Sequence, residues 1–262
     1  MLDLNKVIED AKRWAYEAGK VQRDNYESNN LKITTKSTDV DLVTEIDELS
    51  ENLIISAIKE SYPHHAILSE ESKNIKRDSE YLWIIDPLDG TTNYAQGLPI
   101  FAVSIALEYK GEIILGVIYQ PILDEMFTSI RGKGAFLNGE KIKISSKNNL
   151  KDSVLATGFP YDRATNQDNN SNYFENMVPK VRGLRRMGAA AYDLANIACG
   201  RLDGYWELNL SPWDVAAGTL IIEESGGEVV KLTDKRDISI IAGNKDICEL
   251  IMSEIKKVDG DK

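Results

Sequence analysis

The chain has 262 residues, of which 42% are hydrophobic and 28% charged, and its formal net charge is -11. This is the composition of a soluble globular protein. No apolar run approaches the roughly 20 residues of a membrane-spanning helix, and the charged opening LDLNKVIEDAKRW is no secretory signal. We therefore predict a cytoplasmic protein without membrane contact, and the negative charge argues against nucleic-acid binding, which relies on Lys and Arg.

The negative charge also sets a condition on any anionic substrate. The surface at large would repel a phosphorylated molecule, so its binding requires a local reversal of charge, for which a bound divalent cation is the simplest device. The two cysteines, Cys199 and Cys248, lie in helical patterns without metal-ligand or CxxC spacing. We predict that both are packed free thiols.

Apolar periodicity predicts two amphipathic helices near the start of the chain. Apolar residues follow three- and four-residue steps over residues 4–21, which defines one face of a long helix. After the strand-like segment LKITT, a second helix begins near Ile46, carries Asp47 in its first turn and ends before Pro63. A brief apolar strand over residues 66–68 then leads directly into Glu70.

A second apolar strand ends in two acids. The stretch YLWIIDPLDGTTNY is apolar up to Asp86 and places Asp89 three positions further on. From Phe101 to Ile144 the pattern changes to short alternating strands, with Asn138-Gly139 as a strong hairpin signal. An antiparallel meander is predicted for this region.

Beyond residue 151 strands and helices alternate. The predicted strands are SVLATGF, GLRRM, DGYWEL, GEVVKL and ISIIAG, and the predicted helices cover residues 173–181, GAAAYDLANIACG, residues 213–225 and the C-terminal segment. The Asn-rich segment 166–172 is predicted to be a solvated surface loop. The pattern indicates an α/β fold with mixed and antiparallel sheets layered with helices, as one large domain or as two packed halves.

Asp86 and Asp89 need something to neutralise them. Carboxylates at the end of a buried strand are costly unless they are paired or bind a cation, and the flanking segments WII and GTTN contain no Lys or Arg. A pair of turn-capping residues is the simpler interpretation, and for a lone Asp-Gly we would prefer it. Here a hard divalent cation with oxygen ligands fits better.

Other acids lie at the ends of predicted elements in the same way. Glu70 ends a strand, Asp47 opens the second helix, and Asp214 follows Trp213 at a helix start. Each alone has an ordinary explanation, as a helix-dipole partner or an exposed loop acid. Their recurrence at element ends favours one shared site.

Gly90 and Thr91 add a second kind of chemistry. Glycine lets the backbone approach an anion closely, and the free N–H groups of a helix start would cradle a phosphate. The Thr91 hydroxyl, beside carboxylates that hold metal, would orient an attacking water, although a helix cap is its ordinary alternative. Two metal ions about 3.5–4 Å apart would clamp a phosphoryl group, so the pattern predicts metal-assisted hydrolysis of a phosphate ester.

WIIDPLDGTTN at residues 83–93 and PWDVAAG at residues 212–218 together resemble the inositol monophosphatase family of lithium-sensitive, magnesium-dependent phosphatases. DLVTEID, LSEES, GKGAFLNG and GLRRMGAAA also match in order, so the likeness covers nearly the whole chain. It implies a single domain over residues 1–262, with halves of about 1–145 and 146–262, folded as a five-layer αβαβα sandwich and assembled as a homodimer. It also implies hydrolysis of myo-inositol monophosphate by in-line attack of a metal-activated water, without a phosphoenzyme.

The resemblance assigns ligands for two Mg²⁺ ions. Glu70, Asp86 and the backbone carbonyl of Leu88 match ligands of the first ion. Asp86, Asp89 and Asp214 match ligands of the second. In Ser69 the chain departs from the family, which commonly has Gly before the acidic pair, and this puts the fine geometry of Glu70 in question.

The resemblance also implies roles around the reacting phosphate. Thr91, with Asp47 or Glu70, matches the group that orients the nucleophilic water, and a third, weaker ion would lie near the same two acids. Gly90 and Thr91 would donate backbone N–H bonds to the phosphate, and Glu207 would bond a substrate hydroxyl or be an exposed strand acid. The residues implied to contact substrate are Gly90, Thr91, Ala190, Glu207 and Asp214.

The substrate stays open at this stage. Arg185 and Arg186 could bind a second phosphate, as in fructose 1,6-bisphosphate, or form an ordinary dimer or surface charge pair. Action on 3′-phosphoadenosine is less favoured, because such relatives usually have Lys where this chain has Thr92. A haloacid-dehalogenase-type aspartyl-phosphate is disfavoured, because that motif separates its acids by one residue. From a different class, a non-enzymatic binding protein would use cations only to stabilise the acidic cluster, but Thr91 and every carboxylate are present, which favours activity.

Overall fold

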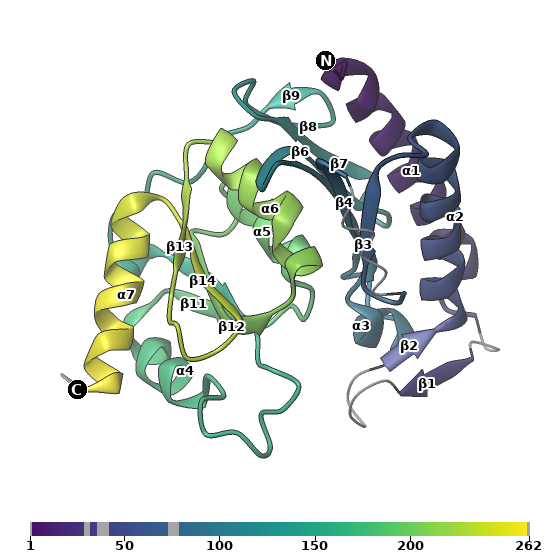
Figure 1. Cartoon of the computed structure of the whole chain (residues 1–262). Helices are drawn as coiled ribbons and strands as arrows, with labels where there is room; N and C mark the ends of the chain where they lie inside the picture. Colours follow the sequence, from purple (N-terminus) through teal and green to yellow (C-terminus); the bar gives the residue numbers. More distant parts are fainter. Residues whose placement is uncertain (1, 29–31, 36–41, 73–78, 261–262) are drawn as a thin grey trace.

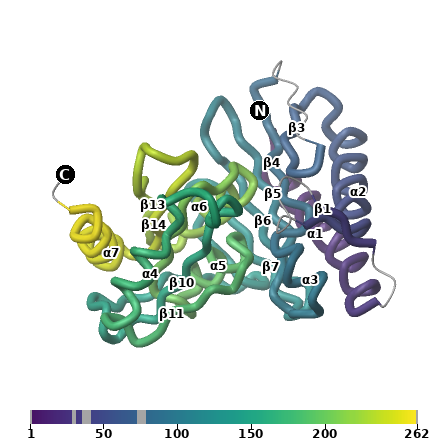
Figure 2. The backbone as a smooth tube through the Cα atoms, turned by 90° about the horizontal axis from the view of Figure 1, so that it is seen from below, coloured from purple at the N-terminus to yellow at the C-terminus, as the bar shows by residue number. Residues whose placement is uncertain are grey.

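The computed structural model describes residues 2–28, 32–35, 42–72 and 79–260. Helices and sheets alternate in five layers, which Figure 1 shows edge-on, from α1 and α2 on one side to α7 on the other. The same outer helices lie at opposite ends of the molecule in Figure 2. The predicted αβαβα sandwich is confirmed. The first residue of the DLVTEID motif, Asp41, lies outside the described residues.

The first layer consists of α1 (Leu4–Asn25) and α2 (Glu45–Ser61), which lie close to where the sequence placed them. Their apolar faces cover one face of the larger sheet. Trp14 of α1 packs edge-on against Trp83 of that sheet, with ring centroids 5.4 Å apart. In the chain between α1 and α2, β1 (Ile33–Thr35) and β2 (Leu42–Thr44) form a short antiparallel ribbon.

The larger sheet has seven strands within the described residues, in the order β3-β4-β5-β6-β7-β8-β9. Only β3 and β4 are parallel, and the rest is the predicted antiparallel meander. The strands are β3 (Ala66–Ser69), β4 (Tyr81–Asp89), β5 (Ala102–Tyr109), β6 (Glu112–Gln120), β7 (Glu125–Ile130), β8 (Ala135–Leu137) and β9 (Glu140–Lys141). The short helix α3 (Thr91–Ala95) follows β4.

The central layer consists of α5 (Ala190–Ala198) and α6 (Pro212–Glu224), which lie between the two sheets. Sheets on both sides explain why α6 is apolar on most of its circumference. It lies so close to β6 that a side chain at Gly116 would come within 2.9 Å of the Ala217 carbonyl oxygen. One hydrophobic cluster joins residues of both sheets to these helices, and for this reason we propose that the two halves form one domain.

The second sheet has the order β11-β10-β12-β14-β13 and the second outer layer is formed by α4 and α7. The strands are β10 (Val154–Thr157), β11 (Gly183–Arg185), β12 (Gly204–Leu210), β13 (Glu228–Lys231) and β14 (Ile238–Gly243), and the helices are α4 (Ser171–Met177) and α7 (Lys245–Asp259). Two 3-10 turns complete it, η1 (Leu150–Asp152) and η2 (Val178–Lys180). None of the helices in the described residues is long and apolar enough to cross a membrane.

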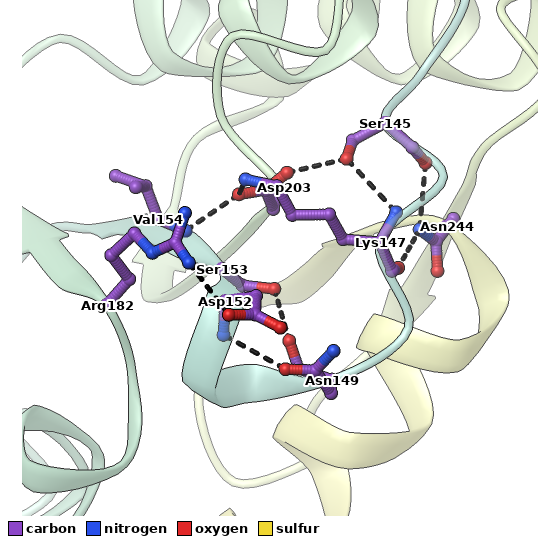
Figure 3. Close-up of polar contacts among 9 residues, drawn as sticks. All are labelled: Ser145, Lys147, Asn149, Asp152, Ser153, Val154, Arg182, Asp203 and Asn244. Atoms are coloured by element: carbon purple, nitrogen blue, oxygen red, sulfur yellow. Dashed lines mark hydrogen bonds and ion pairs between the residues drawn. The ribbon is translucent and has the colours of Figure 1, made fainter.

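The segment that joins the halves is held by Asp203, as Figure 3 shows. Its carboxylate, about 1% exposed, accepts hydrogen bonds from Ser145 Oγ at 2.5 Å, Lys147 Nζ at 2.8 Å and the Val154 N–H at 2.7 Å. Asn244 donates in turn to the Ser145 and Lys147 carbonyls. The connection between β9 and β10 is therefore fixed to the second sheet.

Two details differ from the sequence predictions. The predicted helix over 173–181 ends at Met177 and continues only as the turn η2. The Asn-rich segment 166–172 is predicted to be a solvated surface loop, and its other residues are exposed or half-buried, but Asn170 is fully buried. Its side chain donates to Thr157 and to the Gly158 carbonyl and accepts from Trp206 Nε1, so it ties the start of α4 to β10 and β12. Cys199 and Cys248 are free thiols in the structure.

Candidate active site

A cavity of about 980 Å³ lies where β4, α3, β10, β12 and the N-terminal ends of α5 and α6 meet. Its described lining contains two cationic side chains, Arg163 and Arg186. Within the described residues seven acids line it: Glu70, Asp86, Asp89, Asp162, Asp193, Glu207 and Asp214. Of the acids that the sequence placed at element ends, Glu70, Asp86, Asp89 and Asp214 thus meet in one cavity, which has an excess of negative charge. Asp47 is not among the lining residues and contacts the cavity through Thr91.

A β-bulge brings Asp86 and Asp89 to the same face of β4. Residues three positions apart in a regular strand point to opposite faces. Here Asp86 pairs with Ser104 and Asp89 with Ala102, so an extra residue is inserted in β4 at Pro87-Leu88. Both carboxylates consequently face the central helices.

Asp89 caps a helix that is distant in sequence. Its Oδ1 accepts the N–H of Ala190 at 3.0 Å and its Oδ2 accepts the N–H of Tyr192 at 3.1 Å. The residue before α5 is Ala189, whose side chain provides no cap. The acid from β4 therefore fixes the start of α5 at the cavity.

Asp214 has a similar position in α6. It is the third residue of that helix and accepts the N–H of Ser211 at 2.7 Å. This confirms the ordinary interpretation, an acid at a helix N-terminus. Each bond uses only part of a carboxylate's acceptor capacity, so Asp89 and Asp214 keep lone pairs that face the cavity.

Thr91 and Asp47 are joined by a hydrogen bond. The Thr91 hydroxyl lies 2.7 Å from Asp47 Oδ1 and 3.2 Å from the Leu88 carbonyl oxygen. Asp47 is fully buried in the first turn of α2, where its Oδ2 accepts the N–H of Thr44 at 2.9 Å. The capping box of Thr44 and Asp47 at the start of α2 therefore holds Asp47 behind Thr91, and Thr91 faces the cavity.

Gly90 has a backbone that other residues would not tolerate. Its φ is +95°, and a side chain would come within 2.8 Å of the Ile100 carbonyl oxygen. The turn delivers Thr91 to the first position of α3 directly after the two acids of β4.

Glu70 follows the last residue of β3, and its N–H donates to the Ile85 carbonyl at 3.3 Å. Ser69, the departure from the family pattern, is a fully buried strand residue with φ outside the left-handed region. The backbone here does not require glycine. The Ser69 hydroxyl has no hydrogen-bond partner within the described residues.

On the side of β12, Glu207 lies in the cavity rather than on an exposed strand face, and Tyr205 donates a hydrogen bond to it. Ala190 is also part of the lining. The two arginines of GLRRMG separate: Arg186 lines the cavity, whereas Arg185 is exposed, lies outside the lining and donates to the carbonyl of Leu184.

Sequence reasoning missed Asp193. It lies in the first turn of α5, lines the cavity and is about 2% exposed. The segment AAYDLANIA looks like an ordinary helix. The available signal was an acid in a helix whose other residues are nearly all apolar, which is costly in a buried layer.

Burial and mutual repulsion raise the pKa of several cavity acids. Burial is the main cause for Asp89, whose pKa rises to about 7, with a further contribution from the charge of Glu70. Burial likewise raises the pKa of Asp214 well above its usual value, again with Glu70 contributing. For Glu207, burial raises the pKa to about 7, against the Tyr205 hydrogen bond and the charge of Arg186.

These shifts mean that the cavity contains more carboxylate than its own cations neutralise. Such acids either take up protons or bind a cation. Among the described residues, no three His, Cys, Asp or Glu side chains already converge as a ligand group for a metal. The donor set nevertheless fits a hard divalent ion, because it consists of carboxylate and carbonyl oxygens with unused lone pairs.

Residues 3–259 match the model of the inositol monophosphatase family. A 41% identical relative from Mesorhizobium japonicum, with 93% of each chain covered, is named inositol-1-monophosphatase. A 44% identical relative from Pseudomonas aeruginosa, covering 82% of this chain and 83% of its own, is named Nus factor SuhB.

Solved structures agree with this sequence match. The extragenic suppressor protein suhB from Bartonella henselae has a TM-score of 0.90 at 42% identity, covering 96% of this chain and 99% of its own. The inositol monophosphatase from Anabaena has a TM-score of 0.87 at 39% identity, covering 98% and 97%. The fold and the cavity define a phosphatase of layered α/β architecture. The chain belongs to the inositol monophosphatase family.

Proposed function

We propose that the protein hydrolyses a phosphate monoester of a polyol, with myo-inositol monophosphate as the preferred substrate and Mg²⁺ as the cofactor. The observation that carries the proposal is the hydrogen bond between Thr91 and the buried Asp47 at the edge of the acidic cavity. A hydroxyl backed by a carboxylate is an acceptor that can orient a water molecule and pass on its proton. Asp89, Asp214 and the other acids surround this pair.

Two or three Mg²⁺ ions would be held by Glu70, Asp86, Asp89, Asp214 and the carbonyl of Leu88. When bound, they neutralise the phosphate and make water a stronger nucleophile. The chain itself then has three tasks. Thr91 and Asp47 orient the water, with Glu70 as a second acceptor; the N–H groups of Gly90 and Thr91 bind phosphate oxygens; and Ala190 and Glu207 contact the alcohol.

Charge decides between a polyol monophosphate and a bisphosphate. Near Arg186 the cavity contains two acids, Asp193 and Glu207, whose ionisation Arg186 favours through its charge. One arginine beside two carboxylates gives no positive excess for a second phosphate. Neutral hydroxyl groups, which donate hydrogen bonds to carboxylates, suit this region better.

The test is phosphate release from myo-inositol 1-phosphate and from fructose 1,6-bisphosphate, each with Mg²⁺ and with EDTA. We expect Mg²⁺-dependent turnover that is faster for the inositol ester. Equal or faster turnover of the bisphosphate would favour fructose-1,6-bisphosphatase activity with Arg186 at the second phosphate. Release that continues in EDTA would contradict the metal-dependent mechanism.

A second candidate function is a non-enzymatic binding role, because relatives such as that from Pseudomonas aeruginosa are named Nus factor. The Asp89→Asn variant separates the two roles, since it removes a charge from the cavity and leaves the surface unchanged. If the variant restores the phenotype of a deletion strain as well as the wild type does, the binding role is the one that the cell requires. Failure of the variant would assign the phenotype to phosphatase activity.

The remaining expectations follow from family membership. We propose a cytoplasmic homodimer whose phosphatase activity is inhibited by lithium. Light scattering of the purified protein and an inhibition series with LiCl against NaCl test the assembly and the lithium sensitivity separately.

A further inference from the structure

Asp193 is a buried carboxyl group with an unused oxygen. Its side chain lines the cavity and is about 2% exposed. Its Oδ1 has no hydrogen-bond partner within the described residues. Leaving a buried acceptor unsatisfied is costly, so this position requires an explanation.

Helix capping does not explain it. The N-terminal N–H groups of α5 at Ala190 and Tyr192 already donate to Asp89, which comes from another element. Asp193 is the fourth residue of α5, at the end of its first turn, and its own N–H donates to the Ala189 carbonyl. Its carboxylate therefore contributes no cap.

Ion pairing does not explain it either. Arg186 is the cavity cation that interacts electrostatically with Asp193, and no salt bridge within 4.0 Å joins the two in the described chain. Burial raises the pKa of Asp193 well above its usual value, and the charges of Glu207 and Asp89 raise it further. Without a ligand, Asp193 is thus in an unfavourable environment.

The surroundings indicate what kind of ligand would satisfy it. Glu207, the acid whose charge raises the pKa of Asp193 most, already accepts the Tyr205 hydroxyl. Asp193 has the greater unused acceptor capacity of the two. A group that donates hydrogen bonds and carries no negative charge is required, and a hydroxyl of the alcohol part of the substrate meets this description.

We infer that Asp193 is a specificity-determining residue that accepts a hydrogen bond from a hydroxyl of the leaving alcohol, next to the region bound by Glu207 and Arg186. The inference rests on the proposed phosphatase function and names a residue that selects esters of polyhydroxylated alcohols. Asp193 discriminates between alcohols, whereas the acids of β4 and α6 act on the phosphate common to all esters.

The experiment compares two esters that differ in the alcohol. Values of kcat and KM are measured with Mg²⁺ for myo-inositol 1-phosphate and for phenyl phosphate, whose alcohol has no additional hydroxyl. The variants are Asp193→Asn, which keeps the shape, and Asp203→Asn as a control, because Asp203 is equally buried but lies in the network of Figure 3 outside the cavity lining. Thermal unfolding is recorded for each protein.

For Asp193→Asn we expect kcat/KM on the inositol ester to fall about 10- to 100-fold, since a hydrogen bond to a charged group contributes about 1.5–3 kcal/mol. KM should rise, phenyl phosphate turnover should change less than about threefold, and the melting temperature should not fall. Asp203→Asn should leave the ratio of the kcat/KM values for the two esters unchanged. Equal losses on both esters, or no loss on either, would overturn the inference.

The proposed function can fail separately. If the wild type hydrolyses neither ester in Mg²⁺, the phosphatase assignment to these substrates is wrong. Saturation-transfer NMR, which measures the binding of free myo-inositol to the wild type and to Asp193→Asn, then tests Asp193 directly. Weaker binding to the variant would support the inference, and equal signals or no binding to either protein would overturn it.

Discussion

Asp203 and Asp193 are ten positions apart, both nearly inaccessible, and their surroundings are opposite. Asp203 accepts bonds from a hydroxyl, an ammonium and a backbone N–H, as Figure 3 shows. Asp193 has an oxygen without any partner in the described residues. The first carboxylate holds the chain together, whereas the second lies in a cavity whose acids have too few cations. Buried charge that the protein itself satisfies is structural, and buried charge left unsatisfied marks the site for a ligand.

The largest expected effect comes from Asp89→Asn. The change keeps the shape but removes a charge that we assign to cation binding. Electrostatic stabilisation by metal contributes several kcal/mol, so kcat/KM with Mg²⁺ should fall by about 1000-fold. Stability should change little, because the lost acceptor to α5 is offset by removal of a buried charge. Steady-state kinetics and a melting curve check both statements, and near-native turnover would remove Asp89 from the mechanism.

Thr91→Val should have the next largest effect. Valine has the shape of threonine but cannot connect a water molecule to Asp47. Loss of a proton-transfer group typically costs about 100-fold or more in rate, and the loss should appear in kcat. Thr91→Ser is the matched control, because it keeps the hydroxyl and should retain most of the activity. If serine and valine were equally impaired, the methyl group rather than the hydroxyl would be the important feature.

Asp203→Asn tests the structural side of the comparison. It weakens the bonds to Lys147 and Ser145, and because the Lys147 side chain is about 39% exposed, the loss should be about 2 kcal/mol rather than the full cost of a broken buried pair. For a chain of this size the melting temperature should fall by about 4–8 °C. Activity per folded molecule should stay within twofold. An unchanged melting temperature would show that the network of Figure 3 contributes no net stability.

The sequence predicted much of this arrangement because its signals are local. Acids at the ends of apolar runs, the Asp-Gly-Thr turn and the first-turn position of Asp47 can all be read from spacing. What it could not give depends on long-range packing. The bulge at Pro87-Leu88 depends on the pairing of β4 with β5. The capping of α5 by Asp89 and the burial of Asp193 appear only when α5 packs between the two sheets. The burial of Asn170 was missed for a similar reason, since its partners Thr157 and Trp206 belong to β10 and β12 of the second sheet.

The pH dependence of stability without metal tests the cavity side of the comparison without a substitution. The pKa of Glu207 is raised from 4.5 to about 7 in the folded protein, mainly by burial. Between these values the folded state binds a proton that the unfolded state does not, so this contribution is fully present below about pH 4.5 and is lost as the pH rises to about 7. In urea unfolding with EDTA, the wild type should lose up to about 1.4 kcal/mol per pH unit from this group.

Glu207→Gln should make the stability depend less steeply on pH, because it removes the contribution of Glu207. A smaller slope should remain, because the pKa values of Asp89 and Asp193 are raised in the same direction. Added Mg²⁺ should stabilise the wild type most at neutral pH, where the cavity acids are ionised and the ion replaces the missing protons. The control is the same titration with Asp203→Asn, which should lower the stability curve without changing its shape between pH 5 and 7. If the wild-type protein became more stable as the pH rises over this range, ionised Glu207 would not destabilise the folded state. The cavity acids would then be satisfied by protein groups, as Asp203 is.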